Sequence, residues 1–134
     1  MNAEKITSIK EFCNDENEGY VVTTTEQVIT FGIGSEQSCC ERWGYFTTND
    51  DVSEFINAEL LNITVVDSEL NSTVFLEKFK EQRVNPKSDE CRMMFINFET
   101  SNGTLQFVAY NTHNGFYSHL AFINSRQLTE SVRL

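Results

Sequence analysis

The sequence predicts a single α+β domain over residues 1–134, mainly an antiparallel twisted β-sheet of about six strands with one or two short helices. β-branched and aromatic residues gather in short runs separated by turns, and the last third of the chain holds consecutive strand-like runs around Asn-Gly pairs. Apolar residues make up 40% of the chain and include eleven phenylalanines, which is enough to form a buried core. One proline and six glycines leave no room for a long flexible linker.

The N-terminal region, residues 1–19, is expected to form a peripheral helix followed by an acidic turn. Ile6, Ile9 and Cys13 recur at helical spacing, and the turn begins at Asn14. Beyond it, β-branched and aromatic content predicts a hairpin or one long bent strand, and then further strands. The strand-like runs lie at residues 20–24, 27–31, 60–67, 91–100, 105–111 and 116–123.

Two further segments carry helical signals. In residues 49–58, Asn49 or Asp50 can cap a helix whose acidic first turn complements the helix dipole. Its inward stripe would hold Val52, Phe55 and Ile56. Residues 73–83 fit either a strand, by alternation, or a helix, because Phe75 and Phe79 are spaced i, i+4. The segment 83–90 holds the proline and is expected to be a loop.

The last third predicts a three-stranded antiparallel meander. Asn102-Gly103 indicates a type I′ turn after the first strand, and Asn114-Gly115 precedes the third. His119, in the middle of the third strand, is expected to be half exposed, and the tail 124–134 is weakly patterned. Period-two alternation would place on one face Leu105, Phe107, Ala109, Phe116, Leu120 and Phe122.

The charge of the chain restricts its partners. Twenty acidic and ten basic side chains give a formal net charge of −10. This field repels phosphate backbones, so direct nucleic-acid binding is not expected, whereas a basic protein surface is a suitable partner. The alternative is that the acidity only provides solubility. No run approaches the roughly 18 apolar residues of a membrane span, and residues 1–10 lack a signal-peptide core, so we expect a cytoplasmic protein without a membrane partner.

Two adjacent cysteines, Cys39 and Cys40, suggest chemistry that their surroundings disfavour. A metal- or thiol-dependent site would combine them with His113. Adjacent side chains of an extended chain point to opposite faces, however, and the flanking Glu36 and Glu41 would raise a thiol pKa. We therefore expect no catalytic residue, no metal and no cofactor, with one cysteine buried. The metal- or thiol-dependent site stays as the alternative function.

Residues 35–46 are expected to form the bend between the first strands and the helix at 49–58. Trp43 and Tyr45 within this bend are aromatic residues of the kind enriched at interaction hot spots. They are equally suited to close one end of a β-sandwich or half-barrel.

These motifs resemble a family of small, functionally uncharacterised phage and prophage proteins, over roughly residues 28–123. The resemblance rests on a Cys-Cys-Glu element, an acidic segment and a late Asn-Gly-aromatic-Tyr hairpin. It implies a phage origin and stoichiometric binding to host machinery, including CRISPR effector nucleases, and carries over no catalytic residue. The matching residues are Gln37, Cys39, Cys40, Glu41, Asp50, Asp51, Asn114, Gly115, Phe116 and Tyr117.

The combined expectation is a phage-derived, non-enzymatic, anti-CRISPR-like inhibitor that acts in the cytoplasm of an infected or lysogenic bacterial host. It would bind a host protein with a basic surface as a monomer or homodimer. A self-associating accessory protein of a mobile element is a further alternative. The partner-binding residues would be Asp15, Glu16, Glu18, Asp50, Asp51 and Glu54, with Trp43 and Tyr45 as the aromatic anchor.

Overall fold

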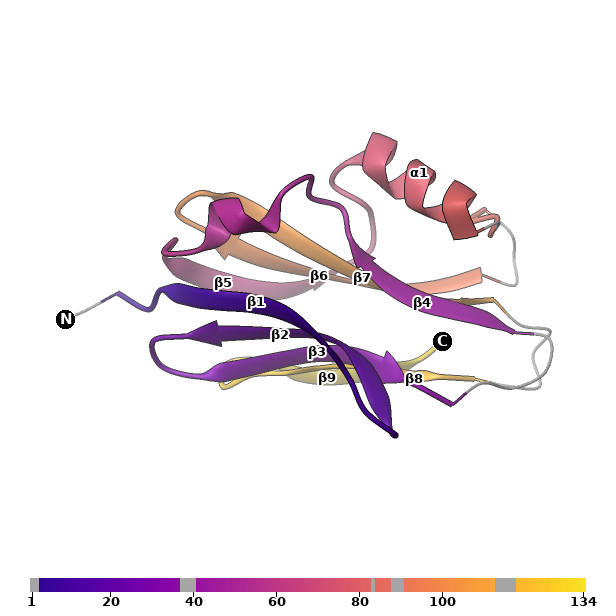
Figure 1. The fold of residues 1–134 in the computed structure, drawn as a ribbon, viewed down its shortest axis with the longest axis horizontal. Helices are drawn as coiled ribbons and strands as arrows, with labels where there is room; N and C mark the ends of the chain where they lie inside the picture. The colour runs from indigo at the N-terminus through magenta and orange to yellow at the C-terminus, as the bar shows by residue number, and fades with distance from the viewer. Residues whose placement is uncertain (1–2, 37–40, 83, 88–90, 113–117) are drawn as a thin grey trace.

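The computed structural model describes residues 3–36, 41–82, 84–87, 91–112 and 118–134. Within these ranges the chain forms nine strands, one α-helix (α1) and one 3-10 helix (η1) (Figure 1). The elements in chain order are β1 Ile6–Cys13, β2 Asn17–Thr24, β3 Val28–Gly34, β4 Arg42–Thr47, η1 Val52–Phe55, β5 Leu60–Val66, α1 Ser72–Gln82, β6 Cys91–Thr100, β7 Gly103–Thr112, β8 Leu120–Asn124 and β9 Thr129–Arg133.

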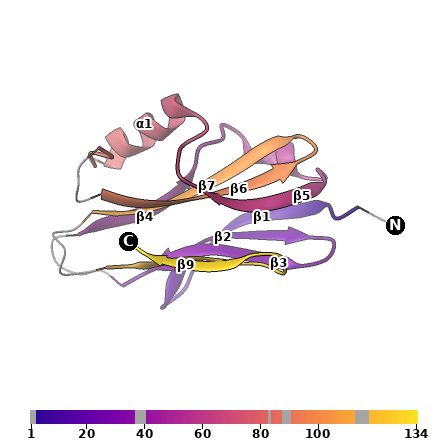
Figure 2. The ribbon, with the colours of Figure 1, turned by 180° about the vertical axis from the view of Figure 1, so that it is seen from behind.

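The strands form two antiparallel sheets that lie face to face in one domain (Figures 1 and 2). The five-stranded sheet has the order β1-β2-β3-β8-β9, and the four-stranded sheet has the order β4-β7-β6-β5. A bridge between Lys5 and Glu59 joins the two sheets at the start of β1 and β5. The predicted class, mainly antiparallel β with a short helix, is therefore confirmed.

The main core lies between the two sheets. Phe31 and Ile123 from one sheet and Phe98 and Phe107 from the other are fully buried there. Leu134, just after β9, is also buried in this core, whereas the side chains of β9 itself are exposed. The weakly patterned tail therefore forms an edge strand held at its end by one buried leucine.

A second, smaller core lies on the outer face of the four-stranded sheet, under α1 (Figure 2). Phe75 and Phe79 of the helix pack there against Phe46, Val108 and Tyr110. Residues 73–83, for which the sequence left two readings open, thus belong to a helix as far as Gln82, with the i, i+4 phenylalanines as its buried stripe.

The expected N-terminal helix is wrong. Ile6–Cys13 is strand β1, which pairs with β2 over seven residue pairs and carries a bulge between Ile6 and Ser8. Ile6 is buried and Ile9 packs partly against the core. Their spacing fits a helix, but β2 offers a complete hydrogen-bonding partner, and β-branched residues favour that pairing.

The predicted meander is also wrong in its third strand. β6 and β7 pair as expected, but β8 pairs with β3 and β9 in the other sheet. Its inward residues are Ala121 and Ile123, whereas Leu120 is exposed, so the predicted face is inverted. Asn114-Gly115 and Phe116 lie outside the described residues.

The Asn102-Gly103 turn differs from type I′. Thr100 pairs with Gly103, and Gly103 has φ 110°, while Asn57 is the only non-glycine with positive φ in the part of the chain that is described. The Thr100 hydroxyl accepts from the Asn102 amide at 3.1 Å and donates to the Gly103 carbonyl at 2.7 Å. These bonds favour a loop of Ser101 and Asn102 followed by a glycine with positive φ.

The expected helix at 49–58 is shorter than predicted. Only Val52–Phe55 is helical, as the 3-10 helix η1, and Asp51 caps it by accepting from the Ser53 amide at 2.9 Å. Phe55 is buried, while Val52 and Ile56 pack partly against the core. No helix in the described ranges is long and apolar enough to cross a membrane.

Candidate functional site

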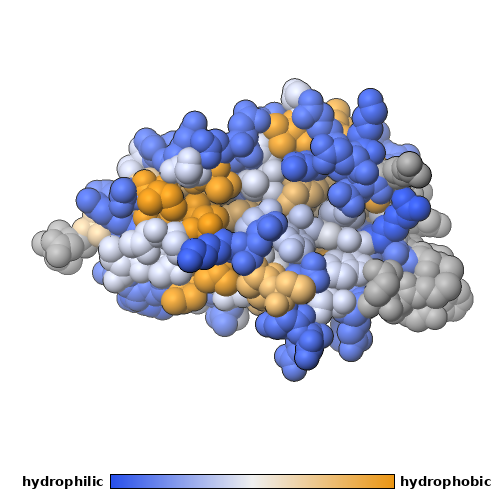
Figure 3. Space-filling view, in the orientation of Figure 1, coloured by the Kyte–Doolittle hydropathy of each residue, from blue (hydrophilic) through white to orange (hydrophobic). Residues whose placement is uncertain are grey.

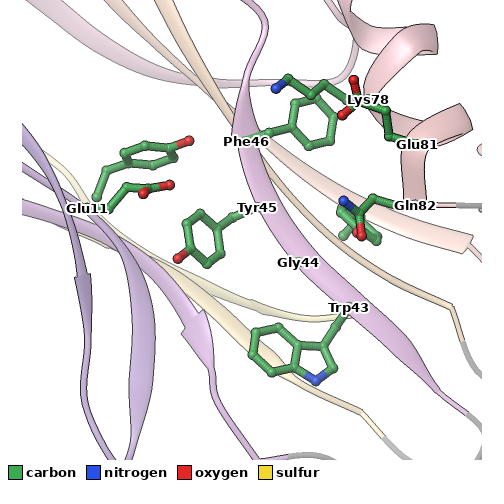
Figure 4. A pocket seen from close by; sticks show the side chains of 10 residues that line it. Glu11, Trp43, Gly44, Tyr45, Phe46, Lys78, Glu81 and Gln82 are labelled. Carbon is green, nitrogen blue, oxygen red and sulfur yellow. The ribbon is translucent and has the colours of Figure 1, made fainter.

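The expected bend at 35–46 ends in a strand rather than in a loop. Arg42–Thr47 is β4, an edge strand of the four-stranded sheet, paired with β7. Alternation along β4 places Trp43 and Tyr45 toward the other sheet and Phe46 toward α1, with Gly44 between them (Figure 4). A strand fits here because β7 supplies the pairing partner and both faces of the sheet are covered.

A buried polar cluster lies at the end of the sandwich where β4 begins. The His119 ring contacts a Glu41 carboxylate oxygen through Nε2 at 2.7 Å and the Gly34 carbonyl through Nδ1 at 2.7 Å. Trp43 stacks on the same ring, with centroids 5.0 Å apart. Glu41 is 5% and His119 is 4% exposed, so the expectation of a half-exposed histidine is wrong.

The cluster continues through Asn111, which is fully buried. Its Nδ2 donates to Glu41 at 3.3 Å and to the Leu134 backbone oxygen at 3.1 Å. The His119 backbone exchanges two hydrogen bonds with Leu134, at 3.1 and 2.8 Å. The cluster therefore joins β7, the start of β4, β8 and the end of β9.

The hydrogen bonds of His119 restrict its chemistry. A carbonyl oxygen only accepts, so Nδ1 must carry a proton and donate it to Gly34. The 2.7 Å contact at Nε2 then needs one proton between the ring and Glu41, whichever of the two groups holds it. Both ring nitrogens are thus engaged, which suits a structural clamp better than a general base or a metal ligand.

A groove runs along β4 between the first sheet and α1 (Figure 4). Its volume is about 230 Å³. Tyr20 and Tyr45 contact each other edge to face in its wall, with centroids 5.4 Å apart. The groove is lined by Glu11, Tyr20, Trp43, Gly44, Tyr45, Phe46, Lys78, Glu81, Gln82 and Tyr110.

Carboxylates surround the Tyr45 hydroxyl. Burial, followed by the charges of Glu18 and Glu11, raises the pKa of Tyr45 to about 12. Glu18 also accepts a hydrogen bond from the Cys13 thiol at 3.4 Å, which raises the pKa of that exposed cysteine. Tyr45 and Glu18, both predicted from the sequence, are therefore brought together, and the sequence analysis missed Glu11.

A second hollow, of about 280 Å³, lies beside the turn between β1 and β2. Asp15, Glu16 and Glu36 line it together with Arg133 and His119. We use the term acidic end for the side chains of Glu11, Asp15, Glu16, Glu18 and Glu36.

The remaining predicted carboxylates lie elsewhere. Asp50, Asp51 and Glu54 flank or belong to η1, and the following residues Asn57 and Ala58 hydrogen-bond to Ile6 at the start of β1. The acidic end lies at the other end of β1, an eight-residue strand, so about 20 Å separates the two groups. The acidic face of six residues is therefore divided into two separate groups. The hydrogen bonds from Ser53 lower the pKa of Asp51, which fits its capping position.

The metal alternative gains no support from the described residues. In these ranges no group of three or more His, Cys, Asp or Glu side chains is placed to hold a metal ion. Cys39, Cys40 and His113 lie outside the described residues, as does the prediction that one of the two cysteines is buried. Cys91 is half-buried, and burial raises the pKa of its thiol to about 11.

The inward placement of Glu41 and His119, which the sequence did not reveal, follows from strand alternation. Glu41, Trp43 and Tyr45 are spaced by two, as are His119, Ala121 and Ile123, and both sets point inward.

The surface on the face seen in Figure 1 consists of hydrophilic residues interspersed with small hydrophobic patches (Figure 3).

Comparison with known proteins gives a family without an activity. No curated protein and no solved structure matches this chain. A family model described as a domain of unknown function, DUF7448, matches residues 3–123, from before β1 to the inward-facing Ile123 of β8. The match covers the four-stranded sheet, α1, Glu41, His119 and the five-stranded sheet except for β9 and the last residue of β8, and on this basis the chain belongs to the DUF7448 family.

Proposed function

We propose that this chain is a phage- or prophage-encoded, non-enzymatic binding protein that inhibits a host nucleic-acid-processing or defence complex. It would occupy a basic surface of that complex, such as the nucleic-acid groove of a CRISPR effector nuclease. The observation that carries the proposal is the acidic end beside two half-buried aromatic residues, Trp43 and Tyr45. The net charge of −10 adds long-range attraction to such a surface.

The state of the buried histidine supports a binding role over a catalytic one. His119 uses both ring nitrogens for hydrogen bonds within the fold. A general base needs a nitrogen within reach of a substrate proton, and here the Gly34 carbonyl and Glu41 occupy both positions. The pair therefore supports the fold that carries the acidic end.

A comparison of the two acidic groups tests the proposal. The variant Glu11→Gln/Glu16→Gln/Glu18→Gln removes three charges from the acidic end. The matched control Asp50→Asn/Asp51→Asn/Glu54→Gln removes three charges near η1, and it keeps a cap because asparagine caps helices about as well as aspartate. Each would be titrated against a panel of purified RNA-guided nucleases, with target cleavage and binding measured at low and physiological salt.

We expect the wild-type chain to inhibit at least one nuclease and the acidic-end variant to bind at least about tenfold more weakly, with a shallower salt dependence. The η1 control should bind within about threefold of the wild-type chain, since charge far from a contact is screened. Inhibition that persists unchanged in the acidic-end variant would overturn this assignment. So would a wild-type chain that binds none of the nucleases at micromolar concentration.

A further inference from the structure

The hydrogen-bonding pattern between β4 and β7 shows which backbone groups of β4 point away from the sheet. The backbone N–H of Thr48 donates to the backbone carbonyl of Gln106 in β7, and the backbone N–H of Gln106 donates to the side-chain oxygen of Asn49. Even-numbered residues of β7 therefore turn their backbone groups toward β4. Because antiparallel pairs alternate, Phe46 and Gly44 bond to β7, while the N–H and C=O groups of Trp43 and Tyr45 point away from it.

Trp43 and Tyr45 both line the groove that runs along β4. Within the described ranges, the outward backbone groups of Trp43 and Tyr45 form no hydrogen bond to another strand. The next outward residue, Thr47, is approached through its backbone by the Tyr20 hydroxyl, which takes the place of a neighbouring strand there. The open edge is thus limited to one short stretch beside Gly44, whose missing side chain makes room for the Tyr110 ring.

The size and charge of the groove indicate its occupant. At about 230 Å³ it is smaller than the roughly 300–1,000 Å³ of small-molecule sites, so it suits a single long side chain of a segment that lies along the edge of β4. Glu11 and Glu81 stand on opposite sides of it with one lysine, Lys78 (Figure 4). Glu18 lies beside Tyr45, and the Arg42 guanidinium donates to the Gln82 carbonyl at 3.3 Å. An arginine or lysine of the occupant would meet carboxylates and the faces of aromatic rings.

We propose that β4 is a docking strand, to which an extended basic segment of the partner adds through the outward backbone groups of Trp43 and Tyr45. The segment extends the four-stranded sheet by one short strand and places an arginine or lysine side chain between Glu11 and Glu81. Main-chain bonds supply affinity, and the acidic walls select for basic residues. This inference rests on the proposed binding function and specifies how the partner is held.

Peptide binding tests the docking strand. The probe is a short, end-capped peptide of alternating arginine and valine. Its first control is the same peptide with every backbone nitrogen methylated, which keeps the charge and removes the strand hydrogen bonds. We expect the methylated peptide to bind at least about tenfold more weakly, and a glutamate–valine peptide not to bind.

A variant that fills the groove gives the matched protein control. Gln82 is exposed on α1 and lines the groove. Gln82→Trp should therefore block the groove and lower the affinity for the arginine peptide at least about tenfold. Thr73 is exposed on the same helix and does not line the groove, so Thr73→Trp should leave binding unchanged.

Amide hydrogen exchange locates the added strand. The Trp43 and Tyr45 amides should exchange faster than those of Gly44 and Phe46 in the free protein, and should be slowed at least about tenfold by saturating arginine peptide. The docking strand would be overturned if the methylated peptide bound as tightly as the unmodified one, or if Gln82→Trp bound the arginine peptide like the wild-type chain. It would also be overturned if the peptide slowed amide exchange only in β5, the other edge strand of the same sheet. Those outcomes leave the acidic-end proposal standing, because its own test is the loss of nuclease inhibition in the charge variants.

Discussion

A single buried histidine shows how one residue can join separate parts of this fold. His119 receives the Trp43 ring on one face and donates to the Gly34 carbonyl at the end of β3. The other ring nitrogen contacts the Glu41 carboxylate, and the His119 backbone exchanges two hydrogen bonds with the Leu134 backbone. Because the pair is buried, its hydrogen bonds are strong while they are complete, and removing one partner is costly.

We predict that His119→Phe destabilises the protein by about 3–5 kcal/mol, the usual cost of leaving one member of a buried pair without its partner. Phenylalanine keeps an aromatic ring against Trp43 but satisfies neither Glu41 nor the Gly34 carbonyl. Urea unfolding at neutral pH measures the loss. Arg126→Ala is the control, because its pair with Glu26 is long, at 3.9 Å, and exposed, so that change should cost under about 1 kcal/mol. Equal losses in the two variants would contradict the clamp.

The position of this pair could be read from the sequence only once the strands were correctly assigned. Leu120 and Phe122 are larger and more apolar than His119 and Ala121, so hydrophobicity alone selects the wrong face of β8. The inward positions of this segment instead hold Ala121 in β8 and, just before the strand, His119 with its own polar partners. Packing against the other sheet decided the face, and a single strand does not encode that information.

At the scale of elements, most runs rich in β-branched and aromatic residues were predicted as strands, whereas β1, β4 and β9 were not. β2, β3, β5, β6 and β7 lie where β-branched and aromatic runs predict strands. β4 and β9 were missed because their pairing partners, β7 and β8, are what make them strands. The partner of β8 was misassigned because nearness in sequence favours β7, whereas the exposed edge of β3 was available in the other sheet.

The attachment of α1 depends on one buried glutamine. Gln106, fully buried in β7, donates to the Ser68 carbonyl at 3.0 Å and to Asn97 at 2.9 Å. Its side-chain oxygen accepts from the Leu70 amide at 3.0 Å and from the Thr48 hydroxyl at 2.9 Å. All four hydrogen-bonding positions of the amide are thus filled, and two of them hold the segment that leads into α1.

We predict that Gln106→Leu costs at least about 2 kcal/mol, because it leaves the Ser68 and Leu70 backbone groups without their buried partner. The stability loss should be local as well as global. Relative to the wild-type chain, amide exchange should speed up more in α1 than in β2 and β3. Thr48→Val removes one bond of the same network and neither bond to the α1 segment, so it should leave exchange in α1 near the wild-type rate. An α1 that exchanges normally in Gln106→Leu would show that Phe75 and Phe79 hold the helix unaided.

At the scale of the whole molecule, the four-stranded sheet is covered on both faces, which explains the near-continuous apolar runs of β6 and β7. One face meets the five-stranded sheet and the other meets α1. Tyrosines take part in both layers: Tyr20 and Tyr45 lie where the sheets meet, and Tyr110 lies under α1. Burial raises the pKa of Tyr20, and raises the pKa of Tyr45 and of Tyr110 to about 12.

We predict that the protein loses stability as pH rises from about 10 toward 12. In that range tyrosines of the unfolded chain release protons near pH 10 while the folded chain keeps them. The unfolded state therefore binds fewer protons, and its free energy falls relative to that of the folded state as pH rises. Tyr110, which is 3% exposed, contributes on the order of 2 kcal/mol to this decline. Tyr110→Phe keeps the ring and removes the titrating proton, so its stability should fall less steeply than that of the wild-type chain, from similar values at pH 8. Urea midpoints measured from pH 8 to 12 check this, and parallel curves for the two proteins would mean that Tyr110 ionises freely in the folded state.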